Sequence, residues 1–211
     1  MTTESQMLAA AIPLAVFMFV SSITPGPNNL MLMSSGMRFG IRRTVPHALG
    51  VTLGLALVMA LSYAGVGALL ASSPALLKTM TVGCAAYLLW LAYGLMRAGR
   101  AAPDDTRERE RAMSVTEAIL FQFINPKVWV MTLTACSIAA NFPLPTWASL
   151  LTLVLLSAAV NLPCISVWAV FGDRLRRQLQ KPGFRTLFNI SMASLVVATA
   201  AWMVMPVLKG G

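Results

Sequence analysis

Long apolar stretches separated by short charged breaks run along the whole chain. A helix needs about 20 apolar residues to cross the roughly 30 Å hydrocarbon core of a bilayer, and six stretches reach that length. We expect the six spans at residues 7–36, 46–71, 74–96, 115–140, 144–171 and 186–208. The pattern predicts an all-α polytopic membrane protein whose outward apolar side chains face the lipid bilayer.

The composition supports a membrane protein over a soluble one. Of the 211 residues, 57% are apolar and only 11% are charged, and the mean hydropathy is +0.73. Soluble domains carry roughly 25% charged residues. The net charge of +9 would suit nucleic acid, but the basic residues lie in the breaks between apolar stretches and form no continuous basic face. We therefore expect no nucleic-acid partner.

The basic residues also predict the orientation of the chain. The breaks after the first, third and fifth spans hold 13 of them, whereas the opposite side would hold only Lys78 and Lys209. Cytoplasmic loops are enriched in lysine and arginine. The three basic breaks are therefore predicted to be cytoplasmic, which places both termini outside.

Two of the six spans are interrupted near their middle by proline. Residues 22–29 read SITPGPNN, and residues 122–129 read QFINPKVW. Each break lies ten or eleven residues from the cytoplasmic end of its span, or about 15 Å along a helix. A proline inside a helix removes a backbone hydrogen bond and costs about 3 kcal/mol. A packing kink is one explanation, and a polar site in the middle of the membrane is the other.

The matching depth of the two breaks favours the polar site. Three spans in each half insert with opposite orientation, which gives a 3+3 inverted repeat with helices 1 and 4 broken at prolines. Residues 1–97 form the first repeat, 98–114 a charged cytoplasmic linker, and 115–211 the second repeat. In transporters of this plan, discontinuous helices at corresponding positions mark the binding site.

The residues at the breaks indicate an anion pocket. Thr24 and Asn125 are good N-cap residues, and each precedes a proline suited to the first turn of a helix. Two half-helices would thus begin in the middle of the membrane, each with a partial positive charge at its start. Lys127 adds a full charge. A carboxylate group suits such a site.

Other polar residues at the breaks complete the predicted substrate site. An intramembrane lysine is a candidate functional residue by default. Asn28, Asn29 and Gln122 could bind the remaining groups of a zwitterion, or could instead link helices. The predicted substrate-binding residues are Thr24, Pro25, Gly26, Pro27, Asn28, Asn29, Gln122, Asn125, Pro126 and Lys127.

These motifs resemble those of a known family. TPGPNN at residues 24–29, the glycines that follow it, and INPK at residues 124–127 resemble the lysine exporter (LysE/RhtB) family over essentially the whole chain. The glycines are Gly36, Gly40, Gly50 and Gly54. The resemblance implies a secondary active exporter of amino acids and close relatives in the bacterial inner membrane, driven by protons, with periplasmic termini. It places residues 25–28 and 125–127 near the substrate path.

The acidic residues constrain the substrate. No Asp or Glu lies in the central part of any span, and the side chain of a lysine or arginine substrate would need a carboxylate partner there. We therefore predict an overall neutral amino acid, with basic amino acids or other small solutes as the alternative. Glu117 follows Ser114 in SVTE, the pattern of a capping box, although it could also carry protons. Proton coupling thus rests on the resemblance alone.

Other functional classes find little support. A metal exporter would need His or carboxylate clusters, and a thiol-electron carrier would need paired cysteines near the prolines; the sequence has neither pattern. We expect no enzymatic activity, cofactor or bound metal, because no nucleophile–base pair or phosphate-binding loop is present.

Four further residues leave alternatives open. Gly50 and Gly54 are spaced for close helix packing, either within the bundle or at a homodimer face. His47, the single histidine, is expected to make a hydrogen bond at the membrane interface, with a pH-sensing role as the alternative. Asn161 either lines the predicted cavity or bonds to another helix.

Overall fold

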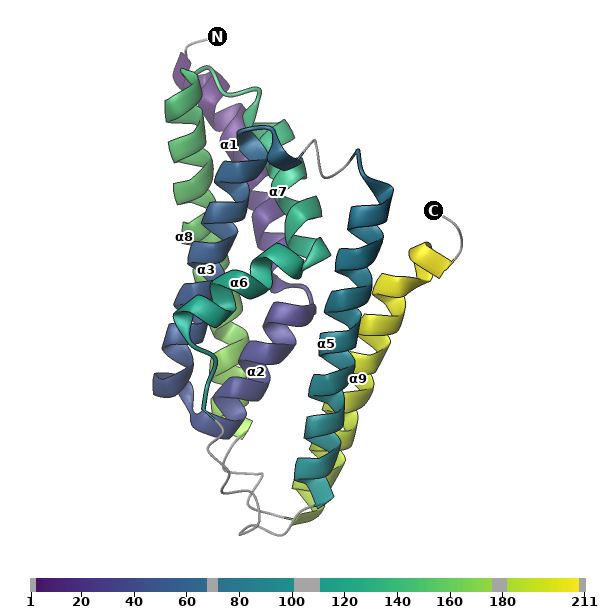
Figure 1. Ribbon diagram of the computed structural model, residues 1–211. Helices are drawn as coiled ribbons and strands as arrows, with labels where there is room; N and C mark the ends of the chain where they lie inside the picture. The colour runs from purple at the N-terminus through teal and green to yellow at the C-terminus, as the bar shows by residue number, and fades with distance from the viewer. Residues whose placement is uncertain (1–2, 68–71, 101–110, 176–181, 209–211) are drawn as a thin grey trace.

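The computed structural model describes residues 3–67, 72–100, 111–175 and 182–208, and the regular structure of these ranges is α-helical throughout (Figure 1). The helices are α1 Thr3–Ile23, α2 Pro27–Phe39, α3 Ile41–Tyr63, α5 Pro74–Arg100, α6 Val115–Ile124, α7 Pro126–Ala139, α8 Thr146–Leu175 and α9 Pro182–Leu208. The all-α prediction is confirmed. The start of α1 and the end of α9 lie toward the upper part of the view in Figure 1.

The helices α1 with α2, and α6 with α7, form the two interrupted spans. The first pair bends by 54° and the second by 76°, each at its proline motif. The helices α3, α5, α8 and α9 are long and apolar enough to cross a membrane unbroken, which gives four candidate spans, or six if each bent pair counts as one. The prediction that the first and fourth spans are broken at prolines is confirmed.

The second span begins earlier than the sequence pattern predicted. It was expected at residue 46, but α3 starts at Ile41, directly after Gly40. Gly40 has φ 81°, a left-handed conformation that glycine adopts without strain, so α2 turns into α3 without a loop. The carboxylate of Asp173 accepts a hydrogen bond from the Ile41 backbone N–H at 3.2 Å and so binds the start of α3.

Each interrupted span packs against the long helix that follows the other one. The helix α3 lies against α6 and α7, and α8 lies against α1 and α2. The remaining helices α5 and α9 run side by side (Figure 1) and pack on α2 through an apolar cluster that includes Leu30, Leu88 and Val196.

Glycines allow the closest of these helix contacts. A Cβ on Gly50 would lie 2.5 Å from the Val115 carbonyl oxygen, and one on Gly54 would lie 2.5 Å from the Gln122 Cγ. Gly36 likewise faces the backbone of Ala169 without room for a side chain. Gly50 and Gly54 therefore pack within the bundle, as one of the two interpretations predicted.

The outer surface is apolar and much of the polar side-chain area is inside. Large apolar side chains such as Trp147, Trp202 and Leu187 are 65 to 72% exposed, whereas Asn29, Gln122 and other polar residues at the breaks are buried. A water-soluble protein would rarely expose apolar area on this scale. The arrangement is that of a protein surrounded by lipid, with some of its buried polar groups at the two breaks.

Candidate functional site

The two breaks meet in space although 103 residues separate them. The Lys127 ammonium group, near the start of α7, donates to the Thr24 hydroxyl at 3.1 Å and to the Thr24 carbonyl oxygen at 3.3 Å. The Lys127 side chain also packs directly against Gly26: a Cβ added to Gly26 would lie 2.9 Å from the lysine Nζ. The two proline motifs thus form one site.

Side chains donate hydrogen bonds to the backbone carbonyls at the end of α1 that have no partner within the helix. The last carbonyls of a helix have no partner within it. The Asn29 amide donates to the carbonyl oxygens of Ser22 and Thr24 at 2.7 and 2.8 Å. The Trp168 indole donates to the Ile23 carbonyl at 3.1 Å. The carbonyl oxygens of Ser22, Ile23 and Thr24 therefore all accept side-chain hydrogen bonds.

The helix α2 starts at a different residue from the one predicted. Its N-cap is Gly26, with Pro27 in the first turn and no side-chain cap, so the prediction of Thr24 as the cap is wrong. A residue before proline avoids the helical conformation, which prevents a helix from starting at Pro25 and continuing through Gly26. The Thr24 hydroxyl instead donates to the Ser21 carbonyl oxygen at 3.1 Å.

The helix α7 starts as predicted. Asn125 is its N-cap, and the Asn125 side-chain oxygen accepts from the Lys127 backbone N–H at 3.1 Å, with Pro126 in the first turn. The Trp129 indole donates to the Phe123 carbonyl oxygen at 2.9 Å, near the end of α6. Trp168 makes the same kind of bond to a carbonyl at the end of α1.

A pair of side-chain amides joins the two interrupted spans close to the breaks. The Asn28 amide nitrogen donates to the Gln122 side-chain oxygen at 2.7 Å, and the Gln122 amide returns a bond to Asn28 at 3.3 Å. Gln122 also donates to the Ala118 carbonyl oxygen at 2.8 Å. Gln122 is fully buried, and the pair links α2 directly to α6.

A second set of polar residues lies behind the breaks. The Asn161 amide donates to the Ser22 hydroxyl at 3.0 Å, and the Thr52 hydroxyl lies 3.5 Å from the Asn161 oxygen. Asn161 thus bonds to another helix, and it also lines the small cavity between the two breaks. Thr52 and Trp168 were not predicted, because only the packing of α3 and α8 on the breaks brings them there. Ser22 and Trp129 lie within the two proline motifs, but their side-chain contacts were not predicted.

The cavity at the junction is small. Its volume is about 30 Å³, and Gly26, Asn28, Asn29, Asn125, Lys127 and Asn161 are among the residues that line it. This is enough space for a water molecule or two and too little for an amino acid. Lys127 is the only charged residue among the described residues that line it. The site is closed in this conformation, and its polar groups bond to one another.

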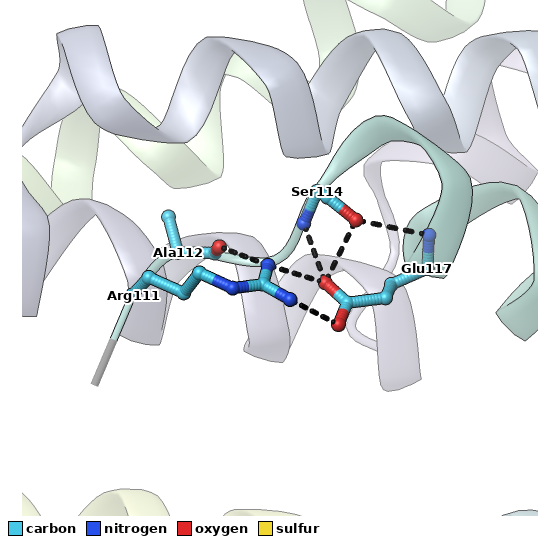
Figure 2. Close-up of polar contacts among 4 residues, drawn as sticks. All are labelled: Arg111, Ala112, Ser114 and Glu117. Carbon is cyan, nitrogen blue, oxygen red and sulfur yellow. Dashed lines mark hydrogen bonds and ion pairs between the residues drawn. The ribbon is translucent and has the colours of Figure 1, made fainter. Parts of the chain in front are cut away.

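Glu117 lies at the other end of α6 and caps that helix (Figure 2). The Ser114 hydroxyl accepts from the Glu117 backbone N–H at 3.3 Å, and the Glu117 carboxylate accepts from the Ser114 backbone N–H at 2.8 Å, so the predicted capping box is confirmed. Arg111 donates to both carboxylate oxygens at 2.7 and 2.6 Å. This carboxylate raises the pKa of the Arg111 guanidinium above its usual value.

Comparison with known proteins identifies the family. The family model described as LysE type translocator matches residues 19–205. The chain belongs to this family. The translocator is also 30% identical to the cysteine/O-acetylserine efflux protein of Escherichia coli (strain K12) over 193 residues, with 87% of this chain and 92% of the relative covered. It is 28% identical over 187 residues to the protein of the same name from Salmonella typhimurium (strain LT2), with the same coverage. No solved structure matches the translocator.

Proposed function

We propose that this translocator is a secondary active exporter of a small, overall neutral amino acid or close derivative. It moves its substrate out of the bacterial cytoplasm by alternating access around the two helix breaks, in exchange for protons, with both termini in the periplasm. The family membership and the efflux-protein names of its relatives support amino-acid export. Cysteine and O-acetylserine, the two compounds in those names, are amino acids without net charge at neutral pH.

The convergence of Lys127 with the start of α2 carries this proposal. The first N–H groups of α2 have no side-chain cap, and the Lys127 ammonium lies against Gly26, the residue that begins this helix. A helix start and a lysine together favour a carboxylate. In the closed state Lys127 is held by Thr24. The substrate carboxylate would take the place of Thr24 as the partner of Lys127.

The Asn28–Gln122 pair supports the step that opens the site. This pair joins the two interrupted spans, so their separation would open the central cavity and release two amides. An ammonium group of the substrate could then bond to the amide oxygens. The ammonium group would replace the amide N–H groups as the donor to these oxygens, while the released N–H groups of Asn28 and Gln122 would donate to other oxygen atoms of the substrate or to water.

The charge of the site favours a neutral substrate over a basic one. Within the part of the chain that the structure describes, Lys127 is the only charged residue that lines the central cavity, and a cationic side chain placed beside it would be repelled. Basic amino acids remain the alternative substrate class, since the carbonyl oxygens at the end of α1 could accept from a cation.

The inverted-repeat plan is the basis of the alternating access that we propose. In this interpretation residues 1–97 and 115–211 are the two repeats, joined by the linker at 98–114. The packing of α3 on α6 and α7, and of α8 on α1 and α2, is the reciprocal contact that two inverted repeats would make. Most of the linker lies outside the described residues, while α5 continues as a helix to Arg100.

The decisive experiment removes the charge at the junction. Proteoliposomes loaded with radiolabelled O-acetylserine, cysteine, arginine or lysine would report export by the wild type and by Lys127→Ala. Loss of two charge-assisted hydrogen bonds and the carboxylate partner should reduce export of the neutral substrates by about 100-fold or more. Lys127→Arg, which keeps the charge, should retain part of the activity.

Lys78→Ala is the matched control, because it removes a lysine near the start of α5, away from the breaks. Wild-type export rates in Lys127→Ala would remove this residue from the mechanism. Transport of arginine without the neutral amino acids would favour the basic alternative. Export that a protonophore leaves unchanged would contradict the proton coupling.

A further inference from the structure

A larger cavity lies between α2, α3, α5 and the start of α6, separate from the closed central site. Its volume is about 330 Å³, and its walls include Ser34, Arg38, His47, Tyr87, Arg111 and Glu117. Sites for small molecules begin at about 300 Å³. This cavity can therefore enclose a small amino acid, which the central cavity cannot.

Two polar side chains in its wall lack partners. His47 and Ser34 are each only 2% exposed. Neither ring nitrogen of His47 nor the hydroxyl of Ser34 has a hydrogen-bond partner among the described residues. The expected interfacial hydrogen bond of His47 is thus wrong, because the histidine points into the bundle. Buried polar groups normally bond to something, and a neutral imidazole and a hydroxyl together offer both donors and acceptors.

The charges around the cavity suit a zwitterion. Arg38 from α2 supplies a cation, and Glu117 from α6 supplies a carboxylate that also bonds Arg111. The rings of Tyr87 and Trp90 from α5 lie 5.6 Å apart in the same wall. A carboxylate is attracted to Arg38, while an ammonium group is attracted to Glu117 and to the faces of the rings.

The cavity lies on the same two helices as the central site. Ser34 follows Asn28 by six residues, about 9 Å along α2, and Glu117 precedes Gln122 by five residues, about 7.5 Å along α6. The Asn28–Gln122 pair therefore lies between this cavity and Lys127. Arg38 and Arg111 belong to breaks that the sequence predicts to be cytoplasmic.

We infer that this cavity is a second binding site, an entry site that holds a zwitterionic amino acid on the cytoplasmic side before the Asn28–Gln122 pair opens. Ser34 and His47 bond the polar groups of the ligand, and Arg38 attracts its carboxylate. This inference rests on the proposed export function, since it places the same substrate class one step earlier on the path.

The test separates the two sites by removing the central one. Purified full-length Lys127→Ala in detergent is titrated with radiolabelled O-acetyl-L-serine in equilibrium dialysis. We expect it to retain one binding site. Adding Ser34→Ala or His47→Leu to this background should weaken binding about tenfold for each hydrogen-bonding group removed. His47→Gln keeps a donor and an acceptor and should weaken binding less.

Ser157→Ala is the matched control, because Ser157 on α8 is also a buried hydroxyl without a partner among the described residues, but it does not line the cavity. Neither His47→Leu nor Ser34→Ala should lower the melting temperature, since each removes an unpaired polar group. Large losses of stability with unchanged affinity would instead show a purely structural role and overturn the inference.

The other outcomes distinguish this inference from the export function. If the wild type exports the probe but Lys127→Ala binds none, or if the Ser34 and His47 variants bind as tightly as Ser157→Ala, the entry site is overturned and export stands. If acetate competes as well as the amino acid, the cavity is a plain anion site and the inference also fails. If the probe binds in a Ser34-dependent manner but the wild type exports nothing, the export function alone is overturned.

Discussion

The two proline breaks are similar in sequence but differ in how their second half-helices begin. At the second break Asn125 caps α7. At the first break α2 begins at Gly26 with no side-chain cap, and the Lys127 side chain from the other half lies against that glycine. The start of α7 is thus already paired by its own residue, whereas the start of α2 can receive a ligand. We therefore propose that the first break binds the substrate carboxylate and that the second break supplies the charge.

The largest effect on this comparison should come from Gly26. In Gly26→Val the new side chain would meet the end of Lys127, since even a Cβ would lie 2.9 Å from the Nζ atom and 3.1 Å from the Cδ atom. The lysine is flexible and should move away from Thr24, so the protein should still fold. Export should fall about tenfold or more, because the lysine and the start of α2 no longer converge.

The control for this variant is Gly83→Ala, since no atom lies within 4 Å of the added Cβ on α5. Alanine is a better helix former than glycine by about 1 kcal/mol, so this variant should be at least as stable as the wild type and export normally. The measurement is initial export rate per folded protein in proteoliposomes. Normal export by Gly26→Val would show that contact between Lys127 and the α2 start is not needed.

An intermediate effect is expected from the amide pair that joins the two breaks. Asn28→Ala and Gln122→Ala, singly and together, form a double-mutant cycle for the free energy of unfolding. Because the two side chains bond to each other twice, the coupling should be about 0.5–3 kcal/mol. Export should also fall in each variant if the amides bind substrate after the pair separates.

The hydroxyl pair of Ser62 and Thr132 offers a matched cycle, because it joins α3 to α7 at 3.0 Å and lies outside the residues of the central cavity. Replacing both with alanine should cost stability without changing the substrate concentration at which export is half-maximal. A coupling energy near zero would contradict the role of the Asn28–Gln122 pair in holding the two interrupted spans together. Unchanged export by the double variant would contradict the role of the two amides in binding substrate.

Features that depend on local backbone chemistry could be predicted from the sequence. The breaks, the Asn125 cap and the Ser114–Glu117 capping box follow from where proline lacks an N–H and where a short polar side chain can replace a backbone partner. The start of α2 was assigned to the wrong residue even though its cause is local. The second proline, Pro27, forces Gly26 out of the helix, and that constraint outweighs the capping preference of Thr24.

Features that depend on helix packing could not be predicted in this way. Trp168 reaches the end of α1 only because α8 packs on the broken span. Likewise, Ser34 on α2 and His47 on α3 line one cavity only because these two helices pack together. In the sequence, Ser34 is one serine in an apolar stretch, and nothing in its spacing distinguishes it from Ser157.

The smallest effect concerns the cap itself. Asn125→Ala removes the acceptor for the Lys127 backbone N–H and should lower the free energy of unfolding by about 1 kcal/mol, as other lost N-caps do. Ser114→Ala removes the corresponding cap of α6 and should cost a similar amount. Unfolding by SDS in mixed micelles, followed by circular dichroism, measures both.

The comparison of the breaks predicts one further difference between these two variants. Asn125→Ala exposes a second uncapped helix start, so inhibition of export by free acetate should strengthen in Asn125→Ala and stay unchanged in Ser114→Ala. Equal inhibition in both variants would mean that the cap does not decide which break binds the carboxylate.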